Sequence, residues 1–346
     1  MTLGIRPVSL TNDRAELIDI LTRNFGPGQD IRFDWRHLDN PAGEAWGWFA
    51  YEQDQKNVVA TVSVFPRRMF VDGKLVVCGQ VGAFAVDPSH RSLGPAVLVQ
   101  RTTFEPVDSG ALAFCYDCPP HDRGMSTFVR LGMQPNCEVT RYALPLRSDE
   151  FLEKRLGRGA WTRPLAGAAN AVLALRTGAR KRNNVEISAL HEPFGEDFSD
   201  LDARVGSRGL IRASRSAELL NWRYRQNPGS GTEVLVARRS GELMGFLSFW
   251  VSEGGAYIVD LFGLQLADTG PALLDAAIEI CKRQRIASLH GYCSSESELR
   301  PLFLSLGFRP RERDARVVAY ENAKRGAGRL LNHGLRWPFG HVELMV

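Results

Sequence analysis

The chain has 346 residues, a formal charge of +4 at pH 7 and six cysteines. One hydrophobic core rarely organises so long a chain, so two domains of about 150 residues are expected. The small net charge gives no reason to expect a nucleic-acid partner, and the sparse cysteines favour a reducing, cytoplasmic compartment. The N-terminal segment lacks the apolar core of a signal peptide. The longest uncharged apolar stretch, residues 165–175, is too short to span a bilayer.

The two copies of an internal repeat show the same predicted elements in chain order. In the first copy these are strands at 5–8, 46–51, 81–86, 112–116 and 139–144, with helices at 14–24 and 96–104 and a further helix ending at Leu131-Gly132. In the second copy they are strands at 185–190, 234–238, 243–251, 256–261, 288–292 and 315–320, with helices at 198–205 and 272–283. This order predicts an α/β class, with two tandem units that each hold a central mixed β-sheet flanked by helices.

Three sequence blocks carry the repeat. WRxxxNP occurs at 35–41 and 222–228, GPA at 94–96 and 270–272, and LGxxP at 131–135 and 306–310. We expect Trp35 and Trp222 to pack in the core and Arg36 and Arg223 to make structural ion pairs. Cys115 and Cys118 form a CxxC without a second pair, so no metal site is predicted.

Domain boundaries follow from the repeat and from the charge distribution. We expect one domain at 1–148, a basic linker rich in Gly, Ala and Arg at 149–184, a second domain at 185–322 and a C-terminal tail at 323–346. The linker carries eight Lys or Arg against three acids. It is expected to pack between the domains, and contact with an anionic membrane surface is the alternative. Trp337 and Phe339 predict that the tail docks on a domain.

Residues 81–96 read VGAFAVDPSHRSLGPA, an apolar strand that runs through a polar turn into a helix. Gly94 allows close backbone approach, the helix start offers free N–H groups, and Arg91 adds a cation, so the segment suits a phosphate. Its glycine spacing matches neither GxGxxG nor the P-loop, which argues against nucleotide triphosphate hydrolysis.

This segment resembles the pyrophosphate loop of the GNAT (GCN5-related N-acetyltransferase) superfamily, written Gln/Arg-x-x-Gly-x-Gly/Ala. Residues 91–96 match each fixed position, and VDPSHR resembles the usual lead-in. The resemblance implies acetyl-CoA or another acyl-CoA as co-substrate, and no metal. The residues implied to bind it are Phe84, Ala85 and Val86 along the pantetheine arm and Arg91, Ser92, Leu93, Gly94, Pro95 and Ala96 around the diphosphate.

The sequence departs from this family at the general acid. The customary tyrosine lies three residues before the Leu-Gly pair, where this chain has Phe128 and, in the second copy, Phe303. Neither can donate a proton. Tyr116 and Asp117 are the nearest catalytic replacements, and His121 and Asp122 are weaker ones.

The second copy keeps the helix start at 270–272 but places Asp268 where a phosphate would bind, so it is expected to be degenerate. The resemblance therefore implies an acyl-CoA-dependent N-acyltransferase, most simply an acetyltransferase, acting on a primary amine of a small metabolite, amino sugar or peptide. Two alternatives stay open. One is a CoA-binding or sensing module, and the other is an aminoacyl-tRNA-dependent transferase on the same tandem fold.

Overall fold

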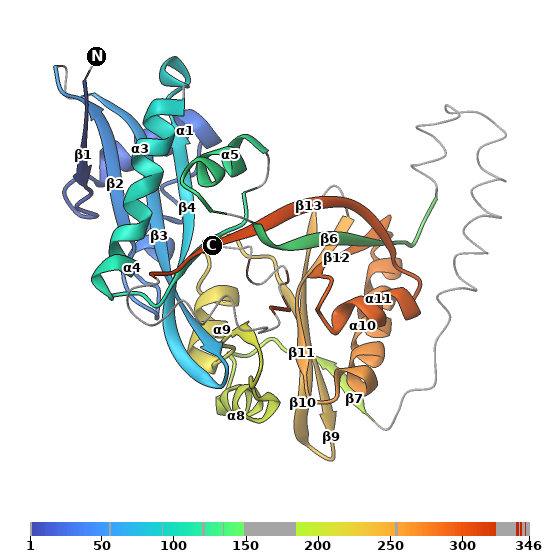
Figure 1. Ribbon diagram of the computed structural model, residues 1–346. Coiled ribbons are helices and arrows are strands. Elements are labelled where there is room, and N and C mark those ends of the chain that lie inside the picture. Colours follow the sequence, from blue (N-terminus) through green and yellow to red (C-terminus); the bar gives the residue numbers. More distant parts are fainter. Residues whose placement is uncertain are drawn as a thin grey trace, which may run out of the picture.

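The computed structural model describes residues 2–54, 57–91, 93–119, 122–133, 135–148, 185–252, 255–322, 337, 338, 340 and 343. Within these residues one 13-stranded mixed sheet runs through both copies, with helices on its faces (Figure 1). The strand order is β1-β2-β3-β4-β5-β13-β6-β12-β11-β10-β9-β7, and β8 pairs with β3 off this path. The α/β class and the mixed sheet predicted from the sequence are confirmed.

The two halves contain corresponding elements in the same order. The first half comprises β1 (Leu3–Pro7), α1 (Arg14–Phe25), α2 (Phe33–His37), β2 (Trp46–Glu52), β3 (Val58–Val71), β4 (Lys74–Val86), η1 (Pro88–His90), α3 (Leu93–Arg101), η2 (Thr102–Phe104), α4 (Glu105–Ser109), β5 (Cys115–Asp117), α5 (Asp122–Arg130) and β6 (Pro135–Pro145). The second half comprises β7 (Glu186–Ala189), α8 (Glu196–Val205), β8 (Ile211–Ala213), α9 (Ala217–Tyr224), β9 (Glu233–Arg239), β10 (Glu242–Ser252), β11 (Gly255–Gly263), α10 (Leu266–Arg283), β12 (Ser288–Ser294), α11 (Leu299–Ser305) and β13 (Arg309–Tyr320).

The repeated LGxxP block ends a helix in both halves. Gly132 follows α5 with φ +86° and Gly307 follows α11 with φ +93°, a left-handed conformation that glycine adopts without a steric penalty. In each half the residue after the glycine donates its N–H to the carbonyl of a buried phenylalanine, Phe128 or Phe303, at 3.0 Å. The block therefore recurs because it caps a helix and turns the chain into the next strand.

The last strands of the two halves are exchanged. The sequence predicts that each unit is completed by its own final strand, whereas β6 pairs with β12 of the second half and β13 pairs with β5 of the first. β6 and β13 also pair with each other, antiparallel, at the centre of the sheet (Figure 1). Alternating side chains specify which face of a strand is buried but not which neighbour it joins, so the pattern left this exchange open. The expected domain boundaries stay predictions, since the sheet itself is continuous.

The two tryptophans of the WRxxxNP motif meet across the boundary between the halves. Trp35 on α2 and Trp222 on α9 stack with ring centroids 4.8 Å apart and an interplanar angle of 18°. Each indole Nε1–H donates to the other residue's carbonyl oxygen, at 2.8 Å from Trp35 and 2.9 Å from Trp222. This reciprocal contact is that of an approximate two-fold axis within one chain. The motif thus recurs because its two copies bind each other.

The ion pair expected for Arg36 is absent from the described part of the chain. Its guanidinium lies 5.4 Å from the centroid of the Phe65 ring, and burial lowers its pKa to about 10. Burial lowers the pKa of Arg223 to about 10 as well, and the nearby charge of Arg67 acts in the same direction.

The linker at 149–184 lies outside the described residues, as does Phe339, whereas Trp337 is buried as expected for a docked tail. No helix in the described ranges is long and apolar enough to cross a membrane.

The tryptophan contact predicts a graded loss of stability. Trp35→Ala removes a buried indole and is expected to lower the free energy of unfolding by about 3 to 5 kcal/mol. Trp35→Phe keeps an aromatic ring and loses the donor to Trp222, so a loss of about 1 to 2 kcal/mol is expected. Urea denaturation of both variants measures the difference, and equal losses would contradict the stacked, hydrogen-bonded arrangement.

Candidate functional site

The cleft of the first half begins where strand β4 leaves strand β5. The two strands pair in parallel at only two positions, Gly79 with Cys115 and Gln80 with Tyr116. Beyond Gln80, β4 continues to Val86 with β3 on one side and no strand partner among the described residues on the other. The free edge of residues 81–86 is therefore open to an extended ligand, as in β-strand addition.

A β-bulge lies in this free segment. Thr61 of β3 pairs with Ala85 and Ser63 pairs with Gly82, so three steps on β4 face two on β3. Ala83 has φ +48°, which is unfavourable for a residue with a Cβ. A bulge leaves a backbone group without its ladder partner and re-aims the neighbouring residues. The strain thus lies in the middle of the segment of β4 that has no second strand partner among the described residues.

Helix α3 starts directly after the turn that follows β4. The first four N–H groups of a helix lack intrahelical partners. Here the third residue of α3 is Pro95, which has no N–H, so Leu93, Gly94 and Ala96 supply the remaining donors. Together with the positive end of the helix dipole they form a site for an anion. Ser92 lies outside the described residues, and Arg91 is exposed beside the helix start.

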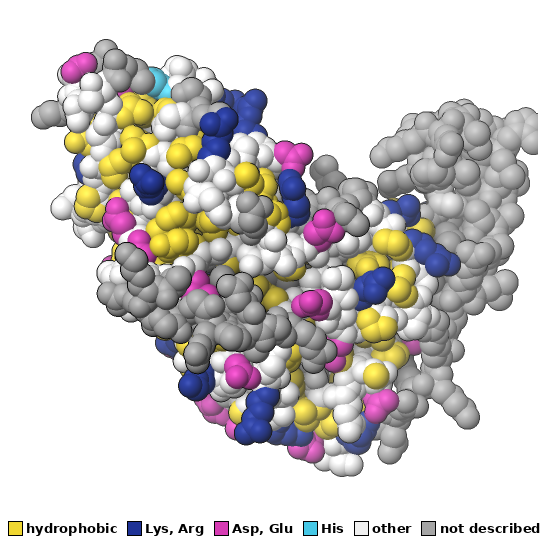
Figure 2. All heavy atoms as spheres, in the orientation of Figure 1, with side chains coloured by type: hydrophobic (Ala, Val, Ile, Leu, Met, Phe, Trp, Pro, Cys, Tyr) yellow, Lys and Arg dark blue, Asp and Glu magenta, His cyan; other side chains and the backbone are white. Residues whose placement is uncertain are grey.

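These parts enclose a cavity of about 850 Å³. Five of the residues predicted to bind the cofactor line it, namely Phe84, Ala85, Val86, Arg91 and Ala96. The opposite wall comes from α5, and the end of α1 closes one side. Its remaining lining residues are Asn24, Phe25, Asp122, Arg123, Gly124, Ser126 and Thr127. Hydrophobic and basic side chains both reach the surface in the region of α3 and α5 (Figures 1 and 2).

Of the α1 and α5 residues of this wall, the sequence indicated only Asp122, as a weaker catalytic candidate, and the others were missed. Phe25 is 55% exposed although it is large and apolar, because it ends α1 at the mouth of the cavity. Arg123 is exposed in the first turn of α5. No motif marks either position. The one signal in the sequence that could have indicated Phe25 is its place directly before Gly26, a residue type that often ends a helix. In the structure Gly26 does so, with φ +87°.

Tyr116 does not line this cavity. Its side chain is buried, at 1% exposure, and packs edge-on against Trp337 with ring centroids 5.4 Å apart. Its hydroxyl donates to the backbone carbonyl of Glu343 at 3.3 Å. Burial raises the pKa of the hydroxyl, so it stays protonated at neutral pH. Strand alternation directs Tyr116 toward the second half and directs its two neighbours to the other face.

Asp117 is half-buried at the end of β5. Burial raises the pKa of its carboxyl to about 7, and the N–H of Cys118 donates to its Oδ1 at 2.7 Å. It is not among the cavity-lining residues. Asp122 lies at the cavity wall and forms an ion pair with Arg316 of β13, and His121 lies outside the described residues. Phe128 is buried in the core beside Met125. Asp117, the carboxyl whose pKa is strongly raised, therefore lies outside the cavity wall but only five positions before Asp122, which lines it.

In the second half two parallel strands also separate, but only a small cavity remains between them. β11 and β12 pair in parallel at Ala256–Leu289 and Tyr257–His290 only, and β11 carries a bulge at Val259. The cavity beside them has about 70 Å³. The C-terminal segment occupies this space: Gly340 bridges to Cys293 of β12, and Pro338, Gly340 and Glu343 line what remains.

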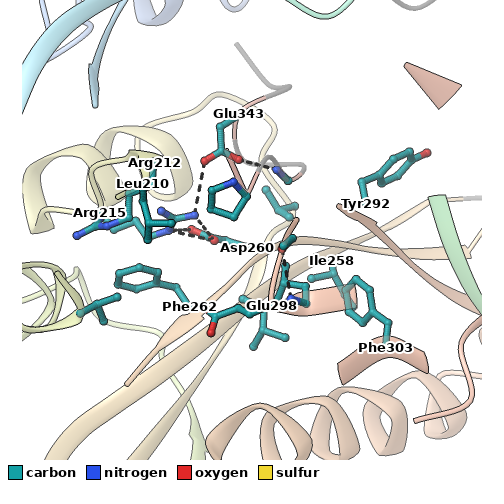
Figure 3. Close-up of a pocket in the computed structure, with 17 residues that line it drawn as sticks. Leu210, Arg212, Arg215, Ile258, Asp260, Phe262, Tyr292, Glu298, Phe303 and Glu343 are labelled. Atoms are coloured by element: carbon teal, nitrogen blue, oxygen red, sulfur yellow. Dashed lines mark hydrogen bonds and ion pairs between the residues drawn. The ribbon is translucent and has the colours of Figure 1, made fainter. Parts of the chain in front are cut away.

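Glu343 fixes that segment among buried charges (Figure 3). Its carboxylate lies 3.8 Å from the guanidinium of Arg215, which also binds Asp260 at 2.9 Å. Burial raises the pKa of Glu343, with the neighbouring charge of Asp260 acting in the same direction. Asp268 lies in the first turn of α10, at the position that corresponds to the anion site of the first half. The second cleft is therefore filled by the chain itself.

No cluster that could hold a metal ion is present among the described residues. Neither Cys115 nor Cys118 is in a disulfide. Cys115 is buried, and burial raises the pKa of its thiol. The described side chains around the open cavity are instead suited to an organic anion with an extended apolar or amide portion.

Comparison with solved structures identifies the fold. The chain is similar to a probable N-acyltransferase from Enterococcus faecalis V583, with 15% identity, a TM-score of 0.66, and 93% of this chain and 73% of that chain covered. It is also similar to a GCN5-related N-acetyltransferase from Anabaena variabilis (14%, TM-score 0.63, 93% and 74% covered) and to Saccharomyces cerevisiae N-myristoyltransferase with bound myristoyl-CoA (13%, TM-score 0.57, 92% and 82%). Searches of family models and of curated proteins returned no match. The chain therefore has the fold of the GNAT-type acyltransferases.

The raised pKa of Asp117 predicts a pH-dependent stability. In the unfolded chain the carboxyl titrates near about 4, and in the folded protein at about 7. The unfolded state is therefore ionised first, and this residue lowers the free energy of unfolding as pH rises from about 4 to about 7. Asp117→Asn keeps an oxygen for the Cys118 N–H and is expected to remove this decrease. Urea denaturation over that range measures it, with the exposed Asp200→Asn as control. A curve parallel to wild type would contradict the assignment.

Proposed function

We propose that this protein is an acyl-CoA-dependent N-acyltransferase, most simply an N-acetyltransferase, that acylates a primary amine. The observation that carries the proposal is the open cavity between the free edge of β4, the start of α3 and the first turns of α5. The proposed activity belongs to residues 1–148, and residues 185–322 form a degenerate supporting domain behind the linker at 149–184.

The bound cofactor is proposed to lie along the cavity from the start of α3 to the bulge at Ala83 of β4. The diphosphate would accept hydrogen bonds from the free N–H groups at the start of α3 and would face Arg91, with Arg123 on the opposite wall. The segment around Ser92 would continue this contact. The pantetheine amides would pair with the free edge of Phe84, Ala85 and Val86, which places the thioester near the bulge at Ala83.

The bulge supplies the proposed electrostatic part of catalysis. An amine that attacks the thioester carbonyl forms a tetrahedral oxyanion, which a fixed backbone N–H stabilises more than water does. The bulge at Ala83 leaves such a group beside the proposed thioester position. Its local strain is then a feature of the site rather than a defect of the fold.

Proton transfer is assigned to Asp117. An alkylamine is protonated near neutral pH and must lose a proton before or during attack, and the thiolate must gain one. A carboxyl with a pKa of about 7 is half ionised at that pH and suits this exchange. Asp117 lies outside the cavity wall, so the proposed route runs through bound water. Tyr116, the second predicted candidate, is assigned to holding the C-terminal segment through Glu343.

The CoA-sensing alternative is supported by Phe128, which stands at the position of the customary tyrosine. It is buried and has no proton to donate. It predicts CoA binding without turnover. The aminoacyl-tRNA alternative gains no support from an open cavity of this size with an anion site at its end.

Cofactor binding is tested by titration calorimetry with acetyl-CoA. Wild type is expected to bind, and Arg91→Glu to bind at least about tenfold more weakly, because the change places a negative charge beside the diphosphate. Arg101→Glu, exposed at the other end of α3, is the matched control and is expected to bind as wild type does. Absence of binding by the wild-type protein would refute the proposed function.

Catalysis is tested by thiol release against a panel of primary amines. Below about pH 7, kcat/KM is expected to rise with pH as Asp117 ionises, and Asp117→Asn is expected to lower it by about 100- to 10,000-fold. Tyr116→Phe keeps the packing against Trp337 and is expected to retain most of the rate. The reverse ranking would assign proton transfer to Tyr116, and binding without release by wild type would establish the sensing alternative.

A further inference from the structure

The turn between β4 and α3 is held by side chains. Asp87 is buried and accepts hydrogen bonds at Oδ1 from the N–H of Ser89 at 3.0 Å and from its hydroxyl at 2.6 Å. Its other oxygen forms an ion pair with Arg23 of α1. His90 ends the short helix η1 and immediately precedes Arg91. The segment that brings Arg91 to the cavity thus depends on these contacts.

His90 has a partner at each ring nitrogen. Nδ1 lies 2.8 Å from the hydroxyl oxygen of Ser89, and Nε2 lies 3.2 Å from Oε1 of Glu52 at the end of β2. One ring nitrogen therefore contacts the η1 turn and the other contacts the end of β2.

Acids and cations both lie close to the ring. Glu52 faces it from β2, and Asp87 lies 4.0 Å from Nδ1 on its own turn. Arg23 of α1 binds Asp87, and the exposed Arg91 directly follows His90. The side chains of His90 and Glu52 are only 16% and 13% exposed, so solvent screens their contact weakly. The ring therefore ties the η1 turn to the end of β2 through a hydrogen bond.

We propose that His90 is a positioning residue for the diphosphate of the cofactor. Its ring holds the turn between Glu52 and Ser89 and thereby fixes Arg91 and the start of α3 relative to β4. Loss of either contact would loosen the turn, and cofactor affinity would then decrease. This inference rests on the proposed function, since it concerns the same cavity.

The probe is dephospho-CoA, which retains the diphosphate, and calorimetry compares the variants at one pH. His90→Ala removes both ring contacts and is expected to bind about fivefold more weakly than wild type. His90→Gln keeps a hydrogen-bonding amide and is expected to recover part of that affinity, whereas an equal loss in both variants would contradict a hydrogen-bonding role. His191→Ala, at an exposed histidine in the second half, is the matched control and should follow wild type.

A double-mutant cycle with Glu52→Gln separates positioning from general destabilisation. Glu52→Gln is expected to weaken dephospho-CoA binding, and the double variant to bind no more weakly than His90→Ala alone, because both changes disturb one contact. Additive effects would overturn the proposal, as would a His90→Ala variant that keeps wild-type affinity. A wild-type protein that binds neither dephospho-CoA nor acetyl-CoA would refute the proposed function instead, so the two failures are distinguishable.

Discussion

The site depends on one constraint in the sheet, which is that β4 pairs with β5 at only two positions and then diverges. Two parallel strands that separate leave backbone donors and acceptors along both edges, and these need a partner. The second half diverges after the same number of pairs, between β11 and β12. There the C-terminal segment supplies a partner by bridging to Cys293. In the first half the edge of β4 instead borders an open cavity of about 850 Å³. One geometry repeated in two copies thus gives an open site and a filled one.

The exchanged strands make the second half an integral part of the protein. Val318 of β13 pairs with Asp117, and Arg316 of the same strand holds Asp122 at the cavity wall. The second half therefore supplies part of the framework around the first site. The stacked tryptophans join the halves a second time, through α2 and α9. Both joints are reciprocal, as expected where a duplicated unit has formed a symmetric contact with itself.

The sequence predicted the strand and the helix on either side of the candidate anion loop, because both depend on short patterns, and the anion site itself stays a prediction. The strand at 81–86, the helix near 96 and the glycine at 94 together indicate a phosphate loop whatever surrounds them. The partner of each strand is not encoded in that way, so the exchange of β6 and β13 was missed. The bulge at Ala83 was missed as well, since alanine carries no signal for positive φ.

Site residues distant in sequence were equally inaccessible. Phe25 and Arg123 approach the anion loop only in the folded chain, from α1 and α5. The contact between His90 and Glu52 joins residues 38 positions apart and follows no spacing rule. Tyr116 and Asp117 are adjacent, yet alternation places them on opposite faces of β5. The sequence could therefore locate a polar strand end, whereas the structure was needed to separate the two side chains.

The buried acids of this protein differ in what compensates their charge. Asp202 binds Arg212 at 2.5 Å and Asp260 binds Arg215 at 2.9 Å, so each of these buried acids has a guanidinium partner. Within the described part of the chain Asp117 has no ion pair, and it accepts a hydrogen bond from the backbone N–H of Cys118. Burial without a cation raises its pKa and makes the folded state less stable once the carboxyl ionises. An apolar residue would remove that cost. The proposed proton-transfer role of Asp117 rests on this raised pKa and on its position at a strand end beside the free edge of β4.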